Sequence, residues 1–547
     1  MGQQEYNEEI NLPFEKLSLL FGGGVGAFGR NLSLFIFNNF RLWIDAGVGF
    51  PHQQHPGLEK TIPSMALINK FAPDVIILTH GHEDHIGAVT FLAPFLKKGT
   101  PVYLTSFTLE LLKVRFREKS IDINYFNIHI VSDLLKIEAG PFQVQFFDIP
   151  HSIPQSLALG ITIDKLNIKM FYTGDFRLPE EPGNKKYKFA DFGPVDFLFC
   201  DSTGAMSKGI NTSEKKIKEN LESVIKNWPG RVFFTTFSSQ IERIQHLYEV
   251  AKHLHRPLGI LGKSLRTHIQ AAYNAEKFSV AASDIFNPSP SNQKSIWIVA
   301  GCQGESNSAL YRMANESNFK FTVSSQDMLI YSASIIPGNS EPVFDILNKL
   351  IKKGVYIYGP DDAHLTMHTS GHGKSADVLK MIDIMKPKTL CPIHGDPLHF
   401  QSMSDLSRSV TGLNCTILNE NYIYTLNDKQ ISKLNEFTDS AQYYEAGSVH
   451  NDYSLYVHRN NMATDGVCNV VIDQKKMQLI EIQYLAVIDE NRLNKSKHDL
   501  KKEIERHIEK IKIPRVNEKK LIQKITRLNV YYLQKKPFVN LQWINLD

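Results

Sequence analysis

Three imidazoles and two carboxylates lie within six consecutive residues of this chain. Residues 80–85 read His80-Gly-His82-Glu-Asp84-His85 and directly follow the apolar run DVIILT. Imidazole nitrogens and carboxylate oxygens are ligands that zinc and similar divalent ions accept. A turn can direct alternate side chains of such a segment at two neighbouring ions. The pattern therefore predicts a metal centre rather than a polar loop with incidental histidines.

Other apolar runs also end in side chains that could bind a metal. These are FQVQFFDIP before His151, IKMFYTG before Asp175, KTLCPI before His394 and RLWI before Asp45. Their β-branched and aromatic residues predict strands. Open α/β sheets gather ligands at the carboxyl ends of their strands. We therefore expect His151, Asp175 and His394 to converge on the HGHEDH segment.

A second polar segment, His368-Thr369-Ser370-Gly371-His372, lies between the strand-like IYG and the helical pattern ADVLKMIDIMK. Backbone N–H groups that precede a helix can bind phosphate. The alternative is a helix cap with incidental histidines. Asp201, Ser238 and Ser239 are weaker candidates for site residues. Asp201 precedes Ser-Thr and could instead cap a turn, and Ser238 and Ser239 could instead cap a strand-to-helix junction.

The spacing of these residues predicts an insertion. Asp175 and His394 are 219 positions apart, and a structureless loop of that length is implausible in a compact domain. From about 206 to 365 the chain alternates longer helical patterns with strands, a βαβ rhythm. We expect a catalytic domain in two parts (1–205 and 366–446), an inserted domain (206–365) and a small α+β domain (447–547).

Composition limits the function and the location. Of 547 residues, 61 are Lys or Arg and 57 are Asp or Glu, so a nucleic-acid partner would require local basic patches. The five cysteines are dispersed and form no CxxC pair, which favours a reducing compartment. Since no run approaches the roughly 20 apolar residues of a membrane span, and the first residues are polar and acidic, we expect a cytoplasmic protein without a membrane partner.

Two nucleotide-binding patterns fail on inspection. Gly24, Gly26 and Gly29 satisfy GxGxxG, but a strand-like run follows them where the dinucleotide fingerprint needs a helix. We expect these glycines to form a hairpin whose backbone approaches the metal centre. GKS at 262–264 lacks the earlier glycine of a phosphate-binding loop, because Pro257 occupies that position.

The order of motifs along nearly the whole chain resembles the ribonuclease J family of β-CASP nucleases. The matching segments are HGHEDHIG, HSIPQS, YTGDFR, CDSTGA, TTFSSQIERIQ, GCQGESNSAL, HTSGHGKS and CPIHGD. This resemblance implies an α/β fold: a metallo-β-lactamase αββα sandwich with an inserted β-CASP α/β domain and a small α+β C-terminal domain.

The resemblance also implies roles for the candidate residues. His80, His82 and His151 would hold one zinc ion, and Asp84, His85 and His394 a second, with Asp175 between them and Asp45 supporting the ligands. Manganese is an alternative ion, because imidazole–carboxylate sites accept both. His372 would be the general acid, oriented by Asp201. The remaining implied residues contact substrate: His368, Thr369, Ser370, Gly371, Ser238 and Ser239.

The implied activity is hydrolysis of RNA phosphodiesters in RNA processing and decay. Two ions would activate a water and neutralise the phosphate. The expected substrate is single-stranded RNA with a 5′-monophosphate, which would be degraded 5′→3′ with additional endonuclease cleavage. The expected assembly is a homodimer or homotetramer, with or without a paralogue. The alternatives are a DNA-processing β-CASP nuclease and a non-catalytic partner of an active ribonuclease J.

Several positions depart from the family pattern. Ala27 replaces an acidic residue of the first glycine loop, and Cys302 replaces a serine. Glu242 replaces a histidine and would repel phosphate if it faced the substrate. These departures concern substrate affinity and end-specificity rather than the metal ligands.

Overall fold

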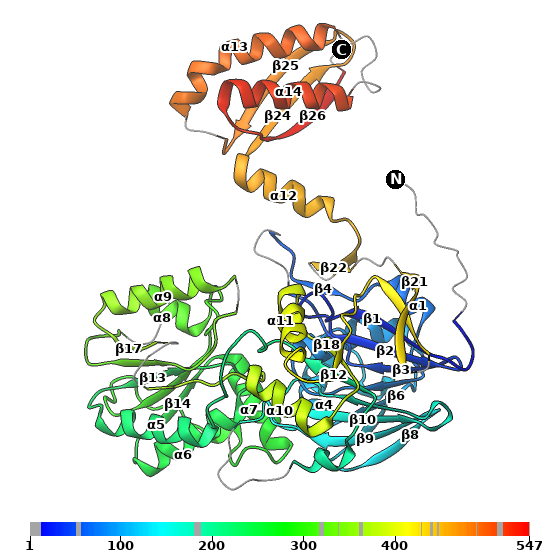
Figure 1. The fold of residues 1–547 in the computed structure, drawn as a ribbon. Coiled ribbons are helices and arrows are strands. Elements are labelled where there is room, and N and C mark those ends of the chain that lie inside the picture. The colour runs from blue at the N-terminus through cyan, green and yellow to red at the C-terminus, as the bar shows by residue number, and fades with distance from the viewer. Residues whose placement is uncertain are drawn as a thin grey trace. The chain divides into compact units, whose positions relative to one another are not determined.

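A computed structural model describes residues 12–50, 56–179, 187–316, 322–336, 338–359, 365–427, 429–437, 441–445, 448–487, 490–510 and 518–545. The chain divides into two compact units (Figure 1). Unit 1 comprises Met1–Phe50 and Thr61–Gln442, and unit 2 comprises Pro51–Lys60 and Tyr443–Asp547. The expected boundary between residues 446 and 447 lies outside the described residues.

Two large sheets form the centre of unit 1. The eight-stranded sheet has the order β21-β20-β1-β2-β3-β5-β6-β7. Its strands are β1 (Leu17–Gly23), β2 (Leu32–Phe37), β3 (Phe40–Ile44), β5 (Val75–Ile77), β6 (Pro101–Leu104), β7 (Asn127–Ile130), β20 (Tyr422–Asn427) and β21 (Gln430–Glu436). The seven-stranded sheet has the order β19-β18-β12-β11-β10-β9-β8. Its strands are β8 (Lys136–Ala139), β9 (Phe142–Asp148), β10 (Leu157–Ile163), β11 (Ile168–Tyr172), β12 (Phe197–Asp201), β18 (Thr389–Ile393) and β19 (Asn414–Cys415).

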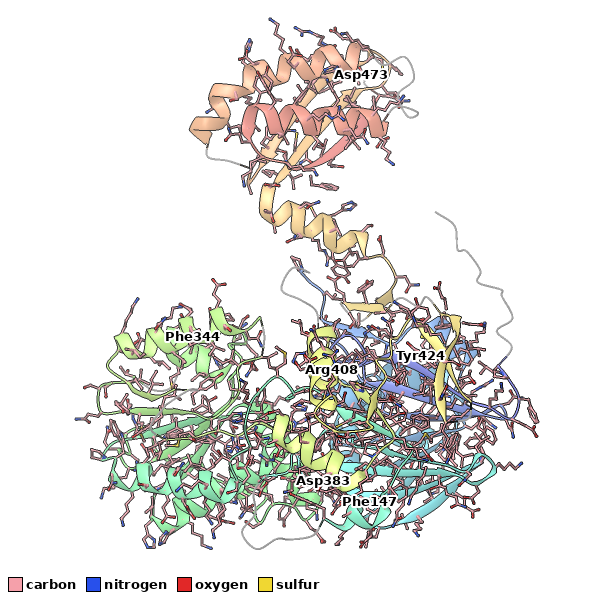
Figure 2. All side chains as sticks on the ribbon, in the orientation of Figure 1. Phe147, Phe344, Asp383, Arg408, Tyr424 and Asp473 are labelled. Carbon is pink, nitrogen blue, oxygen red and sulfur yellow. The ribbon has the colours of Figure 1, made fainter. Side chains whose placement is uncertain are left out.

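Apolar side chains hold these sheets together in layers. One cluster, which includes Tyr424 of β20 (Figure 2), draws residues from both sheets and fills the space between them. Two further apolar clusters lie between the outer faces of the sheets and the helices that cover them. In one of these clusters, Phe147 of β9 (Figure 2) packs with residues of α10 and α11. The helices are α1 (Met65–Lys70), α2 (Glu83–Ile86), α3 (Val89–Leu92), α4 (Ser106–Glu118), α10 (Ser375–Met385) and α11 (Pro397–Ser407), with 3₁₀ turns at Ala93–Phe95, Ile123–Tyr125, Asp164–Leu166 and Lys188–Phe192. This is an αββα sandwich.

A five-stranded parallel sheet of order β14-β15-β13-β16-β17 forms the inserted part of unit 1. Helices α5 and α6 cover one face of this sheet, and α8 and α9 cover the other (Figure 1). Val232 and Phe234 of β13 pack on the side of α5 and α6, and Phe233 packs on the side of α8 and α9. The strands are β13 (Val232–Thr235), β14 (Leu258–Leu261), β15 (Ile296–Val299), β16 (Met328–Tyr331) and β17 (Tyr356–Tyr358). The helices are α5 (Glu214–Asn227), α6 (Ile241–His253), α7 (Lys263–Asn274), α8 (Ala309–Asn315) and α9 (Ser340–Lys352), with a 3₁₀ turn at Ala282–Asp284.

The insertion separates two neighbouring strands of the sandwich. β12 pairs in parallel with β18, although residues 202–388 intervene, and β11 pairs in parallel with β12. β9 is antiparallel to β10, which is antiparallel to β11, so β9 runs in the same direction as β11. The carboxyl ends of these four strands therefore meet at one rim, which is where the sequence predicts its ligands.

Unit 2 contains a three-stranded sheet of order β25-β24-β26 and two long helices that pack on it. Its elements are β23 (Ser448–His450), α12 (Ser454–Asp465), β24 (Val467–Asp473), β25 (Gln478–Leu485), α13 (Glu490–Glu509), α14 (Glu518–Leu533) and β26 (Phe538–Ile544); β4 (Lys60–Ile62) and β22 (Gln442–Glu445) span the division between the units. The expected fold class, a lactamase sandwich with an inserted α/β domain and a small α+β domain, is confirmed. In the described part of the chain, no helix has the length and apolarity to cross a bilayer.

Candidate metal centre

Three imidazoles meet at the first of two adjoining groups. His80 and His82 follow β5, and His151 follows β9. His82 Nδ1 lies 3.0 Å from His80 Nε2 and 3.2 Å from His151 Nε2. His80 and His151 are buried. Because burial favours the neutral ring, the pKa of His80 and that of His151 lie well below the usual range, and the nitrogen lone pairs stay available.

Asp84, His85 and His394 form the second group, and Asp175 lies between the two. His394 Nε2 is 3.1 Å from Asp84 Oδ2, and His85 Nε2 is 3.7 Å from the same oxygen. Asp175 Oδ2 lies 3.3 Å from His85 Nε2 and 3.6 Å from His80 Nε2. The structure thus brings together all seven predicted ligands from four separate stretches of sequence. Converging nitrogen and carboxylate lone pairs suit divalent cations, so the donor set fits the metals that the sequence predicts.

The backbone around the centre is unusual at two positions. Asp45, after β3, and His394, after β18, both have positive φ angles, 64° and 52°. Such angles are uncommon outside glycine and cluster at functional sites. His394 is held by its backbone N–H, which donates to Gly24 O at 2.7 Å, and Gly26 N–H donates to Gly395 O at 3.0 Å. The glycine loop between β1 and β2 therefore approaches the centre as a hairpin, as predicted.

A close backbone approach explains one glycine beside Asp45. An added Cβ at Gly47 would lie only 1.5 Å from the carbonyl oxygen of Asp84. The backbone of the β3 end can therefore pack against the short helix that carries Asp84 and His85 only if residue 47 has no side chain.

Each of the five imidazoles has a partner at its second nitrogen. His85 Nδ1 is 2.7 Å from Asp45 Oδ2, and Asp45 in turn accepts from the N–H and hydroxyl of Thr79. His151 Nδ1 is 2.7 Å from the carbonyl oxygen of Gly371. The other pairs are His80 Nδ1 with Thr79 Oγ1 at 3.1 Å, His394 Nδ1 with Thr203 Oγ1 at 3.1 Å, and His82 Nε2 with Ser239 Oγ at 3.0 Å. Such outer partners orient ligand rings and fix their tautomers.

His372 lies at the edge of the two groups and is paired with Asp201. Its Nδ1 is 2.8 Å from Asp201 Oδ2, and that carboxylate is fully buried while the imidazole is 21% exposed. Burial opposes the charged ring, but the carboxylates of Asp201 and Asp175 outweigh burial and raise the pKa of His372. Asp201 Oδ1 also accepts from Thr203 N–H at 2.9 Å. The two oxygens of Asp201 thus have different contacts: Oδ1 accepts from the backbone as in a turn cap, and Oδ2 faces the imidazole of His372.

The segment 368–371 precedes α10 and is held by an arginine of the insertion. Arg243, buried in α6, places Nη1 2.8 Å from His368 Nδ1. A guanidinium can only donate, so His368 Nδ1 accepts and Nε2, 2.8 Å from Ser334 Oγ, carries the proton. Burial and the Arg243 charge keep the pKa of His368 well below its usual range.

Glu214, at the start of α5, joins two buried arginines. It accepts from Arg243 at 2.6 and 3.1 Å and from Arg177 at 3.1 Å, and Arg177 also donates to Ser370 O at 3.2 Å. Burial disfavours its charge, but the two guanidinium groups lower its pKa to about 2. The sequence interpretation missed Glu214 and both arginines. An arginine beside Ile241 and Ile244 on the apolar stripe of a helix was the available signal.

The other predicted residues differ in their distance from the centre. Ser239 contacts His82, whereas the neighbouring Ser238 donates to Ser264 Oγ at 2.9 Å. Glu242 is 56% exposed and lies 3.7 Å from Arg177 Nη2, so an arginine offsets the charge that was expected to repel phosphate. Cys302 is buried in the core of the insertion.

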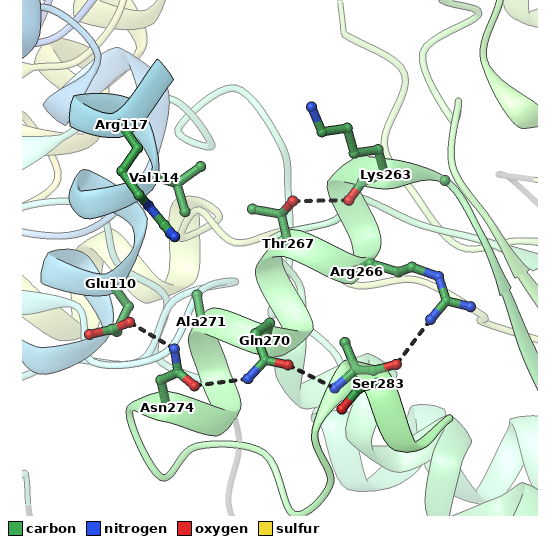
Figure 3. A pocket seen from close by; sticks show the side chains of 12 residues that line it. Glu110, Val114, Arg117, Lys263, Arg266, Thr267, Gln270, Ala271, Asn274 and Ser283 are labelled. Carbon is green, nitrogen blue, oxygen red and sulfur yellow. Dashed lines mark hydrogen bonds between the residues drawn. The ribbon is translucent and has the colours of Figure 1, made fainter. Parts of the chain in front are cut away.

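Two cavities border the sandwich and the insertion. One of about 1330 Å³ includes His151 and Ser156 from the sandwich, and Glu242 and Lys277 from the insertion. Of the seven predicted ligands, His151 alone lines this cavity, which thus borders the metal centre at that residue. The other, of about 660 Å³, lies between α4 and α7, where Asn274 donates to Glu110 at 2.9 Å (Figure 3). None of the residues that line this second cavity belongs to the centre.

Three stretches of the chain match known protein families. Residues 41–221 match the beta-lactamase superfamily domain, residues 229–350 the ribonuclease J beta-CASP domain, and residues 365–418 the Zn-dependent metallo-hydrolase RNA specificity domain. The fold and the centre thus define a hydrolase of the metallo-β-lactamase fold that contains a β-CASP insertion.

Individual relatives narrow this class. The chain is 34% identical to the ribonuclease J of Sinorhizobium meliloti over 72% of this chain and 71% of that protein. It is 29% identical to the ribonuclease J of Thermus thermophilus over 96% and 93%. A crystal structure of a protein of unknown function from Enterococcus faecalis V583 shares the fold, with a TM-score of 0.54 and 16% identity over 75% of this chain and 100% of that one. The chain belongs to the ribonuclease J family of metal-dependent ribonucleases.

Proposed function

We propose that this chain hydrolyses single-stranded RNA at a centre of two zinc ions, as a 5′→3′ exonuclease that prefers a 5′-monophosphate and also cleaves internally. The observation that carries the proposal is the meeting of seven buried or half-buried ligand side chains from four stretches of sequence. His80, His82 and His151 would hold one ion, Asp84, His85 and His394 the other, and Asp175 would contact both. Manganese is the alternative ion.

The ions supply activation of water and neutralisation of the phosphate charge. The chain's own residues do the rest. Asp201 holds Nδ1 of His372 at 2.8 Å, which leaves Nε2–H to protonate the leaving 3′-oxygen as general acid. Thr369, Ser370 and Gly371 bind phosphate, with Ser238 and Ser239 on the insertion side, and His368 joins them by exchanging its Nε2–H contact with Ser334 for a phosphate oxygen. Asp45 supports the ligands from behind.

The location and the assembly of the protein form part of the same proposal. The catalytic domain comprises residues 1–205 and 366–446, the β-CASP domain 206–365, and the C-terminal domain 447–547. The protein acts in the cytoplasm as a homodimer or homotetramer, alone or with a paralogue.

Digestion of one RNA sequence with different ends tests the proposal. The 5′-monophosphate form should be degraded processively, the 5′-triphosphate form slowly, and the matching DNA least. Variants Asp84→Ala and His85→Ala should lose both metal and turnover. Equal digestion of DNA would favour the DNA-processing alternative, and a wild-type chain that binds no metal would favour the non-catalytic subunit.

A further inference from the structure

The contact between His82 and Ser239 joins the inserted domain to a ligand of the sandwich. Of the five imidazoles, four have second-nitrogen partners from the sandwich segments or the 368–372 loop: Thr79, Asp45, Gly371 and Thr203. His82 alone among the five is paired with a residue between β13 and α6 of the insertion. The insertion thus supplies one outer partner of the centre.

The geometry fixes which way this hydrogen bond runs. His82 Nδ1 is the nitrogen that lies among the ligands, 3.0 Å from His80 Nε2 and 3.2 Å from His151 Nε2. An imidazole that uses Nδ1 as a ligand is neutral and carries its proton on Nε2. His82 Nε2–H therefore donates to Ser239 Oγ at 3.0 Å. Since Oγ accepts from His82, the Ser239 O–H is available to donate to an anionic oxygen of the substrate.

The turn that carries Ser239 is braced within the insertion. Thr236 Oγ1 donates to Gln240 Oε1 at 2.8 Å, and Ser238 Oγ donates to Ser264 Oγ at 2.9 Å. The backbone N–H of Ile241 donates to Ser239 O at 2.8 Å. A braced acceptor constrains the ring that it contacts, because a shift of the imidazole would break the hydrogen bond.

We propose that Ser239 is a positioning residue for the metal centre: it holds His82 in the Nε2–H tautomer and so couples metal binding to the docked position of the inserted domain. This inference rests on the proposed function, because it takes His82 as a ligand. Loss of an outer hydrogen-bond partner of a ligand histidine typically lowers metal affinity by about 10–100-fold. Ser239 should therefore affect metal retention and not only substrate affinity.

Zinc affinity of the full-length chain tests the role of Ser239. Wild type, Ser239→Ala, Ser239→Thr and the control Ser283→Ala, at an exposed serine of the insertion, are titrated with zinc against a chromophoric chelator, without RNA. Ser239→Ala should lower the affinity for one of the two zinc ions by about 10–100-fold. Ser239→Thr retains the hydroxyl and should bind zinc as wild type does, and so should Ser283→Ala. If the alanine variant fails to fold, Ser239→Gly removes the same oxygen.

The outcomes separate this inference from the proposed function. A wild-type chain that retains two ions, together with an alanine or glycine variant of unchanged affinity, overturns the role of Ser239 and leaves the function intact. Equal weakening by Ser283→Ala also overturns it, since the effect would then not depend on the contact with His82. A wild-type chain that binds no zinc refutes the proposed function and the inference together.

Discussion

Replacing Asp201 by Asn tests the proposed general acid most directly. The carboxylate is fully buried, and its Oδ2 lies 2.8 Å from His372 Nδ1. The amide keeps an oxygen that can accept from Thr203 N–H, but it removes the negative charge beside the imidazole. Hydrogen bonds to charged groups contribute about 1.5–3 kcal/mol. At about 1.4 kcal/mol per tenfold, the expected fall in kcat is roughly 10- to 150-fold.

The pH profile should move in a defined direction. Asp201 raises the pKa of His372 against the opposing effect of burial. A general acid acts only while it is protonated, so its loss of activity at high pH follows its pKa. Asp201→Asn should therefore shift the alkaline limb of kcat to lower pH.

The assay is single-turnover cleavage of 5′-labelled RNA, with metal content measured on the same samples because Asp201 Oδ1 also lies 3.6 Å from His394 Nδ1. Glu222→Gln is the matched control, since it removes the charge of a carboxylate that lies 2.6 Å from the exposed His253 Nδ1. A fully metal-loaded Asp201→Asn chain with wild-type kcat and an unmoved alkaline limb would refute the assignment of His372.

Three further predictions concern the surroundings of the centre. Gly371→Ala should reduce metal content and activity, because a Cβ would lie 2.8 Å from a ligand imidazole, whereas Gly359→Ala meets nothing within 4 Å and should be neutral in metal analysis. Glu242→Gln removes an exposed negative charge and should lower KM for RNA by roughly 1.5- to 5-fold. This difference in KM should disappear when steady-state kinetics are measured in high salt, which screens the charge. Glu214→Gln leaves two buried arginines without their carboxylate and should lower the free energy of unfolding by about 3–5 kcal/mol. Because the pKa of Glu214 is lowered to about 2, its stabilisation of the fold is complete above the usual pKa of 4.5 and is lost as pH falls towards 2. The free energies of unfolding of wild type and variant, measured with denaturant, should therefore converge near pH 2. A constant difference across pH would contradict this.

The proximity of the seven ligand side chains was predictable because strand ends are local signals. His151, Asp175 and His394 each follow an apolar strand, and parallel strands end at one rim whatever the length of chain between them. The fold class was implied by the resemblance of the motifs to the ribonuclease J family, and the long interval between Asp175 and His394 required an insertion. The ligand roles themselves stay a prediction until metal is measured.

Contacts between domains could not be predicted in the same way. Ser239 was assigned from its motif to substrate or to a helix cap, and nothing local indicates that its hydroxyl meets His82. Glu214 and Arg243 are 29 residues apart, and their contact depends on how α5 and α6 pack. Glu242 was expected to repel phosphate if it faced the substrate, whereas tertiary packing places it near Arg177.

The parallel pairing of β12 with β18 has a consequence for biosynthesis. When β12 leaves the ribosome, its partner strand is still 187 residues away, which corresponds to roughly 10–40 s of elongation. Throughout this interval the nascent sheet ends in an open edge, the kind of edge that invites aggregation. All five strands of the insertion's parallel sheet lie within residues 232–358, so this sheet can form before β18 is synthesised. His394, the last of the seven predicted ligands along the chain, is translated only after the insertion. The ligand set is therefore completed late in the synthesis of each chain.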